Sequence, residues 1–317
     1  MKNLISIFLS VILFMGVTSC MSGYRYADSP AMEFSDFNYG FPVKLSKAEP
    51  RIAYIDEGSG SKTIILVHGL ASNAGFWRYN IAELSKEYRV IAIDLPGYGR
   101  SQKADKFSYS MPFFADAVNQ LITELKLGKV VYVGHSMGGQ IGLTLAMNHP
   151  EVLDQLILAA PAGFEPFARG EGDWLKSVIT IEGVKTTNEE GIRRNLASNF
   201  YNWRDDLEWM VEERARMAKA VEFDDFAYTV TRSVTAMVDQ PTVKKLDKIS
   251  LPVTIIHGEF DGLIPNPYLH PGVTHDVYLK AVGHLPNYKI VTIPDAGHMI
   301  QIEKPAEFDA AVLNALK

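Results

Sequence analysis

Short apolar runs alternate with segments of helical spacing along most of this chain, and this alternation constrains the fold more than any other feature. Apolar runs fall at 64–67, 89–93, 129–134, 153–160, 252–258 and 288–293, and helical spacing marks 75–88, 111–127, 137–149 and 304–316. Apolar runs without polar alternation are typical of strands covered on both faces. Strands that alternate with helices predict an α/β fold, in which a mostly parallel sheet carries helices on both faces.

One long segment interrupts the alternation. Residues 164–248 have helical spacing, many charges and three tryptophans, and they contain no convincing strand run. The strand pattern is present before this segment, at 51–163, and returns after it, at 249–317. We therefore expect one α/β core that is divided by a helical insertion at 164–248.

The N-terminus differs in character from the rest. Lys2 precedes an apolar run from Leu4 to Val17, which is shorter than the roughly 20 residues that a membrane-spanning helix needs and is typical of a signal peptide. The run ends at "VTSC", which resembles the lipobox of bacterial lipoproteins and contains Cys20, the only cysteine. This pattern predicts a signal peptide at 1–19 and an exported protein anchored to a membrane through lipidated Cys20. The outer membrane is favoured in a Gram-negative cell. An ordinary signal peptide followed by an incidental cysteine is the alternative.

Residues 20–50 are expected to form an N-terminal tether. Glycine, serine and proline interrupt any period there, and scattered aromatic residues indicate that part of the tether packs on the domain.

Charge and histidine placement narrow the partners. The 317 residues carry a net charge of −6 with no basic field, so we expect no nucleic-acid partner. His270, His275 and His284 share one stretch, but they lack the carboxylate–histidine spacing of a known metal site. We expect neither a metal nor a cofactor.

The segment "VVYVGHSMGGQIG" (130–142) places Ser136 inside a Gly-x-Ser-x-Gly pattern between an expected strand and an expected helix. This context is typical of a nucleophile elbow, where a sharp turn presents a serine at the carboxyl end of the sheet. Larger residues at Gly134 or Gly138 would collide with neighbouring backbone in so tight a turn. The pattern predicts that Ser136 is a nucleophile.

A serine nucleophile needs a base and an orienting carboxylate. His298 follows the last expected strand and Asp261 follows the strand before it, so the chain order is serine, aspartate, histidine. This order is the one expected for a nucleophile elbow on an α/β sheet. The negative charge that develops on the substrate oxygen would be held by the backbone N–H groups of Leu70 and Met137. The residues expected to line a substrate pocket are His68, Phe167, Trp174, Trp203, Leu263 and Met299.

Five motifs resemble those of the α/β-hydrolase superfamily and occur in order along nearly the whole mature chain. They are "LVHGLASNAGFW", "VIAIDLPGYGRS", "VGHSMGG", "GEFDGLIP" and "PDAGHMIQIEKP". The insertion at 164–248 resembles the cap domain of that superfamily. The resemblance implies that Asp94, Gly97, Gly99 and Ser101 structure their loop rather than react. The segment between Asp261 and His298 is longer than is common.

The sequence favours a serine hydrolase that cleaves a carboxylic ester, with membrane anchoring pointing to a lipid-like ester such as an acylglycerol. Two alternatives stay open. Carbon–carbon bond hydrolysis of the meta-cleavage product type uses similar motifs, and an arginine of the cap in the pocket (Arg193, Arg194 or Arg232) would favour it. A non-catalytic surface lipoprotein on a hydrolase scaffold is the other alternative.

Overall fold

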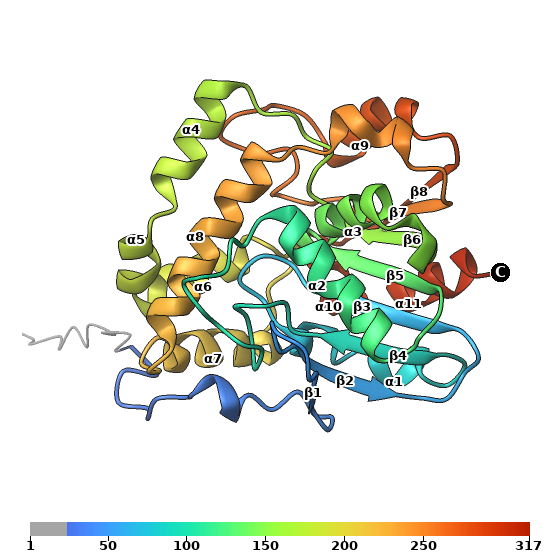
Figure 1. The fold of residues 1–317 in the computed structure, drawn as a ribbon. Helices are drawn as coiled ribbons and strands as arrows, with labels where there is room; N and C mark the ends of the chain where they lie inside the picture. The colour runs from blue at the N-terminus through green and yellow to red at the C-terminus, as the bar shows by residue number, and fades with distance from the viewer. Residues whose placement is uncertain (1–23) are drawn as a thin grey trace, which may run out of the picture.

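A computed structural model describes residues 24–317, so the expected signal peptide and Cys20 lie outside the described residues. An eight-stranded sheet in the order β1-β2-β4-β3-β5-β6-β7-β8 organises this part of the chain (Figure 1). The six strands β4, β3, β5, β6, β7 and β8 pair in parallel, whereas β1 pairs antiparallel with β2, and β2 pairs antiparallel with β4. The fold is therefore α/β with a mostly parallel sheet, as predicted. The strands are β1 (Lys44–Leu45), β2 (Ala53–Glu57), β3 (Thr63–Val67), β4 (Arg89–Ile93), β5 (Val130–His135), β6 (Leu153–Ala159), β7 (Val253–Gly258) and β8 (Tyr288–Ile293).

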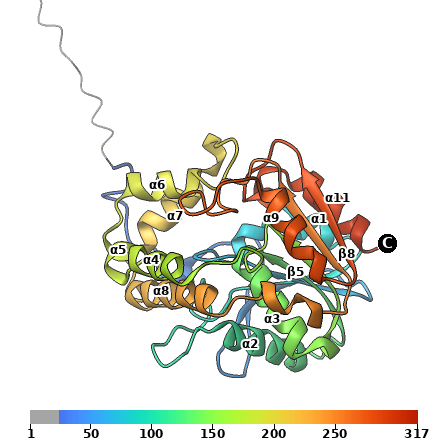
Figure 2. The ribbon, with the colours of Figure 1, turned by 90° about the horizontal axis from the view of Figure 1, so that it is seen from above.

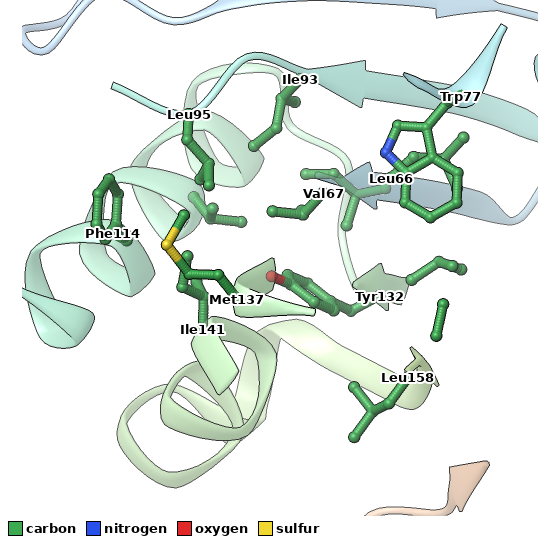
Figure 3. Packing of buried hydrophobic residues seen from close by; sticks show 14 of the residues in the cluster. Leu66, Val67, Trp77, Ile93, Leu95, Phe114, Tyr132, Met137, Ile141 and Leu158 are labelled. Atoms are coloured by element: carbon green, nitrogen blue, oxygen red, sulfur yellow. The ribbon is translucent and has the colours of Figure 1, made fainter. Parts of the chain in front are cut away.

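Helices cover both faces of this sheet. α2 (Met111–Glu124) and α3 (Met137–Asn148) lie side by side on one face, while α1 (Ile81–Leu84) and α11 (Pro305–Ala315) lie on the other (Figure 2). The central strand β3 is buried at every position because it has strands on both edges and helices on both faces. Leu66, Val67 and Tyr132 pack between Met137 of α3 on one face and Trp77 on the other (Figure 3).

Residues 164–248 lie between β6 and β7 and contain helices and no strand; we call this helical insertion the cap. Its helices are α4 (Arg169–Val178), α5 (Ile181–Thr186), α6 (Glu189–Ala197), α7 (Trp209–Met217) and α8 (Phe223–Asp239). α4 and α5 pack on α8, whereas α6 packs on α7. A short 3-10 helix at Val243–Lys248 returns the chain to β7.

The segment 24–50 is attached to both the core and the cap. Phe34, Phe37 and Tyr39 are buried in the main core, and Lys44–Leu45 adds an edge strand to the sheet. Lys219 of the cap donates hydrogen bonds to the carbonyl oxygens of Tyr26, Ala27 and Ser29 at 3.0, 2.6 and 2.7 Å. Aromatic burial and these hydrogen bonds join residues 24–50 to the core and the cap, in the way that the aromatic residues of the expected tether indicated.

Two local expectations differ from the structure. The helical spacing over 75–88 resolves into a 3-10 helix (Ala74–Trp77) and the short α1, because Trp77 and Asn80 are both fully buried and the chain must turn at once into β4. The long segment between Asp261 and His298 contains an unpredicted helix, α9 (Thr274–Ala281). Across residues 24–317, no helix has the length and apolar character that crossing a membrane requires.

Candidate functional site

Ser136 occupies a strained turn between β5 and α3. Its backbone angles are φ 52° and ψ −115°, a region that residues other than glycine rarely adopt. A Cβ atom added to Gly134 would lie 2.4 Å from the carbonyl oxygen of Gly138, and one added to Gly138 would lie 2.5 Å from that of Val67. Both positions therefore require glycine, because a larger residue would collide with neighbouring backbone, as the sequence predicts.

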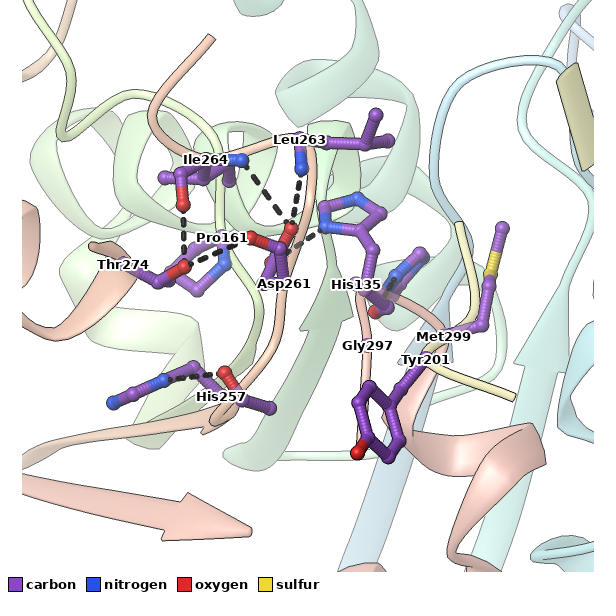
Figure 4. Close-up of polar contacts among 12 residues, drawn as sticks. His135, Pro161, Tyr201, His257, Asp261, Leu263, Ile264, Thr274, Gly297 and Met299 are labelled. Atoms are coloured by element: carbon purple, nitrogen blue, oxygen red, sulfur yellow. Dashed lines mark hydrogen bonds and ion pairs between the residues drawn. The ribbon is translucent and has the colours of Figure 1, made fainter. Parts of the chain in front are cut away.

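Asp261 and His298 form a buried pair beside this turn. Nδ1 of His298 lies 2.8 Å from Oδ2 of Asp261, and both side chains are almost completely enclosed. The other carboxylate oxygen accepts hydrogen bonds from the N–H groups of Leu263 and Ile264 at 2.9 and 3.2 Å (Figure 4). Because the Asp261 carboxylate accepts a hydrogen bond from Nδ1 of His298, the proton of the neutral imidazole stays on Nδ1. Nε2 then keeps its lone pair. This arrangement leaves Nε2 free to act as a base.

The three strand ends bring Ser136, Asp261 and His298 to one edge of the sheet. They follow β5, β7 and β8, which lie close together in the parallel part of the sheet. In residues 24–317, the hydroxyl of Ser136 makes no hydrogen bond, so its contact with His298 is not formed in this conformation. Such contacts are often long in the unliganded state and shorten when substrate binds.

The cap holds the loop that carries His298. The carbonyl oxygen of Asn199, at the end of α6, accepts hydrogen bonds from the N–H groups of His298 and Met299 at 2.8 and 3.1 Å. The buried carboxylate of Glu303 accepts from the N–H groups of Gly297 and Tyr201 at 2.8 and 3.1 Å. The candidate base is therefore positioned by the cap as well as by the core.

His135 contacts the loop that carries His298. Its Nε2 lies 3.0 Å from the carbonyl oxygen of His298, and its pKa is lowered well below the usual value because the ring is buried. A neutral ring can donate its Nε2 proton to that carbonyl. His135 therefore positions His298 through the backbone.

The two expected oxyanion donors flank the serine. Within the described residues, neither the Leu70 N–H nor the Met137 N–H donates a hydrogen bond to the protein. A Cβ atom on Gly69, which precedes Leu70, would lie 3.0 Å from the Cβ of Ser136, so this loop passes directly over the nucleophile. Free N–H groups beside a serine can stabilise negative charge on a substrate oxygen.

His68 shapes the same loop. Its Nε2 accepts a hydrogen bond from the Leu95 N–H at 3.0 Å, which requires Nδ1 to carry the proton that is donated to the Gly69 carbonyl oxygen at 2.7 Å. Burial lowers the pKa of His68 to about 4, so the ring stays neutral. It fixes the Gly69–Leu70 backbone and takes no part in proton transfer.

Asp94 organises the neighbouring loop, as the resemblance implied. Its carboxylate accepts hydrogen bonds from the N–H groups of Ala74 and Arg100, both at 2.7 Å, and from the Tyr39 hydroxyl at 2.8 Å. A Cβ atom on Gly99 would lie 2.2 Å from the carboxyl carbon of Asp94. Gly97 and Gly99 both adopt positive φ, and the Ser101 hydroxyl donates to the Asp94 carbonyl oxygen at 2.6 Å.

A cavity of about 300 Å³ lies between the cap and the Leu70–Ala71 loop. Most of its lining is apolar and comes from α4, α5, α6 and α8; it includes Val178, Ile179, Val184, Ile192, Leu196, Phe223 and Val230. Leu70, one of the two candidate oxyanion donors, lines this cavity, whereas Ser136, Met137 and His298 are not among its lining residues. The cavity therefore reaches the loop beside the serine but not the serine itself.

None of the six residues expected to line the substrate pocket lines this cavity, so their assignment to a pocket stays a prediction. Each is used elsewhere. His68 and Leu263 contact the loops described above, and Phe167 stacks on His270 with ring centroids 5.6 Å apart. Trp174 is 39% exposed, while Trp203 and Met299 pack in the hydrophobic cluster of α6 and α7, which shares Ile192 and Leu196 with the cavity wall. Aromatic character alone does not show which side chain turns toward a cavity.

Arg214 of α7 is a cavity residue that sequence reasoning missed. Its guanidinium donates to the Ala71 carbonyl oxygen and lies over the ring of Phe226, 5.4 Å from the centroid. No ion pair joins it to an acidic side chain of residues 24–317, although the carboxylate of Glu213, which accepts from Asn73, is also buried nearby. The cap arginines named from sequence are elsewhere: Arg193 pairs with Glu189 and Glu208, and Arg194 and Arg232 are exposed.

His257, His270 and His275 make contacts with neighbouring side chains. His270 pairs with Glu165 at 2.5 Å and Glu171 at 3.3 Å, and His275 lies 3.3 Å from His257. In the part of the chain that the structure describes, no group of three histidine, cysteine or acidic side chains has a metal-binding arrangement.

Comparison with known proteins identifies the relatives of this chain. The sequence profile of a family described as "alpha/beta hydrolase fold" matches residues 62–305. A 2-hydroxy-6-oxononadienedioate/2-hydroxy-6-oxononatrienedioate hydrolase of Burkholderia vietnamiensis (strain G4 / LMG 22486) is 26% identical, over 85% of this chain and 92% of that protein. A pimeloyl-acyl-carrier-protein methyl ester esterase of Pectobacterium carotovorum subsp. carotovorum (strain PC1) is 25% identical, over 81% of this chain and 95% of that protein. The crystal structure of a probable hydrolytic enzyme from Pseudomonas aeruginosa PAO1 superposes with a TM-score of 0.78 at 26% identity, covering 91% of this chain and 99% of that one.

Proposed function

This chain belongs to the α/β-hydrolase superfamily and is a hydrolase, and from that premise we propose that it cleaves a carboxylic ester through an acyl-enzyme on Ser136. One observation carries the proposal: a buried Asp261–His298 pair at 2.8 Å stands at the same sheet edge as a serine in a nucleophile elbow. A buried histidine oriented by a carboxylate is what a serine needs to become nucleophilic.

The mechanism follows from these groups. His298 Nε2 takes the hydroxyl proton while Ser136 Oγ attacks the ester carbonyl, and the N–H groups of Leu70 and Met137 hold the oxyanion. His298 then gives the proton to the departing alkoxide, which leaves as the alcohol. Water, deprotonated by the same nitrogen, attacks the acyl-enzyme and releases the acid. Asp261 stays ionised throughout and stabilises the imidazolium. No step requires a cofactor.

The cavity supports an apolar, lipid-like acyl or alcohol group. Its lining is largely aliphatic, and about 300 Å³ is the size of a small-molecule site. An acylglycerol is a substrate of this kind. We further propose that the protein is exported and anchored to a bacterial membrane through lipidated Cys20, the outer membrane in a Gram-negative cell; mass spectrometry of the mature N-terminus tests that proposal.

The test of the esterase proposal uses residues 21–317 as a soluble protein. We expect hydrolysis of p-nitrophenyl esters, with an optimum acyl length set by the cavity, and loss of at least about a thousandfold in kcat for Ser136→Ala. A fluorophosphonate should label the wild-type serine and leave the variant unlabelled. Folded protein that neither hydrolyses esters nor takes up the label would overturn the proposal and favour a non-catalytic lipoprotein on a hydrolase scaffold.

Arg214 supports a second candidate, carbon–carbon bond hydrolysis of a carboxylated substrate. A cap arginine in the cavity is the feature that such a substrate would need, and a relative carries the name of a dienedioate hydrolase. A charge-assisted hydrogen bond from Arg214 to a carboxylate contributes about 1.5–3 kcal/mol, or roughly ten- to a hundredfold in KM. The discriminating assay compares vinylogous diketone acids with neutral esters for the wild type and Arg214→Gln. A selective loss on the diketone acids favours this candidate, and an equal effect on both substrates removes it.

A further inference from the structure

Three exposed apolar side chains lie on the outside of the cap where α4 meets α5. We call them the cap-mouth patch: Trp174, Val178 and Ile181, which are 39%, 51% and 40% exposed. Trp174 and Val178 are four residues apart on α4 and so share one helix face, and Ile181 begins α5. Large apolar groups gathered on a surface are typical of sites that contact another apolar phase.

The patch adjoins the substrate cavity. Val178, Ile179 and Thr180 line the cavity at the turn between α4 and α5, and Gly183 and Val184 continue its wall along α5. Leu70, which also lines this cavity, follows Gly69, whose loop passes over Ser136. The patch therefore lies on the part of the cap that encloses a cavity reaching the loop beside Ser136.

The first described residues lie on the same side of the cap, next to α5 and α6. The hydroxyl of Tyr24 accepts a hydrogen bond from Asn188, and the N–H groups of Arg25 and Tyr26 donate to Glu189 at 3.0 and 2.8 Å. These contacts attach the segment to the start of α6, two residues after α5 ends (Figure 2). Tyr24 is four positions after Cys20, so the chain between them can span at most about 14 Å. An acyl chain on Cys20 would hold the α5–α6 side of the cap against its membrane.

Charge does not explain contact on this side. Lys176 pairs with Asp173 and Asp239 at 3.2 and 2.8 Å, and Lys185 pairs with Asp224 at 2.7 Å. Lysines that are neutralised in this way offer little attraction to anionic headgroups. Arg25 and Arg194 on the same side also lie near acidic side chains, 3.8 Å from Glu208 and 3.9 Å from Glu190. Apolar insertion together with the anchor is therefore the source of contact that we propose.

We propose that the cap-mouth patch docks on the lipid bilayer to which acylated Cys20 anchors the protein, so that the cavity draws an acyl-chain ester from the membrane surface. This inference rests on the proposed esterase function for its substrate and on the predicted lipidation for its orientation. It identifies the substrate class as esters resident in a bilayer rather than esters dissolved in water.

The docking step is tested without catalysis. The full acylated chain carrying Ser136→Ala is placed in vesicles of phosphatidylcholine with brominated acyl chains, which quench nearby tryptophan. We expect tryptophan fluorescence to be lower in these vesicles than in vesicles without bromine. We expect most of this quenching to disappear in Trp174→Phe. Quenching that is absent, or equal with and without Trp174, overturns the docking proposal whatever the enzyme hydrolyses.

The substrate route is tested with Ile181→Glu, which alters the patch at a residue that does not line the cavity. The matched control is Leu279→Glu on α9, an apolar side chain that is 53% exposed and does not belong to the patch. The readout is the rate on a long-chain ester in vesicles divided by the rate on a short soluble ester. We expect this ratio to fall about tenfold in Ile181→Glu and to stay constant in the control. An unchanged ratio in Ile181→Glu overturns the route; if the wild type cleaves neither ester, the proposed function fails and the quenching result alone decides docking.

Discussion

The sheet edge and the cap achieve their geometry in different ways. At the sheet edge, short-range backbone contacts hold the reactive groups: a strained turn presents Ser136, and two N–H groups and an imidazole hold Asp261. In the cap, the cavity wall is assembled from separate helices whose inward side chains depend on how those helices pack. The comparison indicates that the chemistry is built into local chain geometry, whereas substrate choice is built into packing.

The two regions meet at His298. Its N–H bonds to Asn199 of the cap while its imidazole bonds to Asp261 of the core. Changes in cap packing can therefore reach the base through the backbone, and four experiments test how separate the regions are.

The largest expected effect is on the core chemistry. In Asp261→Asn, an amide facing Nδ1 of His298 favours the wrong tautomer, because an amide N–H can donate where only an acceptor is useful. We expect kcat on the best ester to fall by about a thousand- to ten-thousandfold, with the fold retained, as measured by steady-state kinetics and circular dichroism. A loss of less than tenfold would contradict the role assigned to Asp261.

The next effect compares a core glycine with a cap glycine. A Cβ atom in Gly138→Ala meets the Val67 carbonyl oxygen at 2.5 Å, whereas one in Gly170→Ala meets nothing within 4 Å. We expect the free energy of unfolding to fall by about 2–4 kcal/mol for Gly138→Ala and to stay level or rise by up to about 1 kcal/mol for Gly170→Ala. Urea unfolding measures both, and equal values would remove the contrast between core and cap.

A pH-dependent effect belongs to the core alone. Burial raises the pKa of Asp309 to about 7 from an ordinary 3.8, although Asn80 donates to it at 2.9 Å. The folded chain therefore binds this proton more tightly than the unfolded chain does, so the stability it contributes is present below about pH 3.8 and is lost as the pH rises to about 7. Asp309→Asn should remove this loss. The free energy of unfolding of the variant, relative to that of the wild type, should therefore be roughly 2–4 kcal/mol higher at pH 8 than at pH 4. Unfolding curves at both pH values check the sign.

The smallest effect concerns the N-terminal segment on the cap. Lys219→Met removes three hydrogen bonds to the carbonyl oxygens of Tyr26, Ala27 and Ser29, at a cost of about 1 kcal/mol after solvent exposure is considered. Hydrogen–deuterium exchange of residues 24–33 should become faster, and Lys244→Met, an exposed lysine elsewhere, should leave it unchanged. Identical exchange in both variants would show that the segment is held by its aromatic residues alone.

Several elements could be predicted because their causes are local. Apolar runs at 64–67 and 130–134 identify strands buried on both faces, and the Gly-x-Ser-x-Gly pattern between strand and helix predicts the turn observed at Ser136. The placement of Asp261 and His298 after β7 and β8 follows from the same reasoning, since carboxyl ends of parallel strands share one edge. The strand β1 was missed because two residues give no periodicity.

The sequence by itself determined the α/β fold, the helical insertion and the three residues at the sheet edge, because strand burial and steric limits on a tight turn act over a few neighbouring residues. Only the tertiary structure decided that Arg214 lines the cavity and that Trp203 and Met299 do not. Which face of a helix turns inward depends on contacts between segments far apart in the chain, such as Arg214 with the Ala71 carbonyl oxygen. No local sequence pattern encodes such a contact, so the residues that line the cavity could be identified only from the tertiary structure.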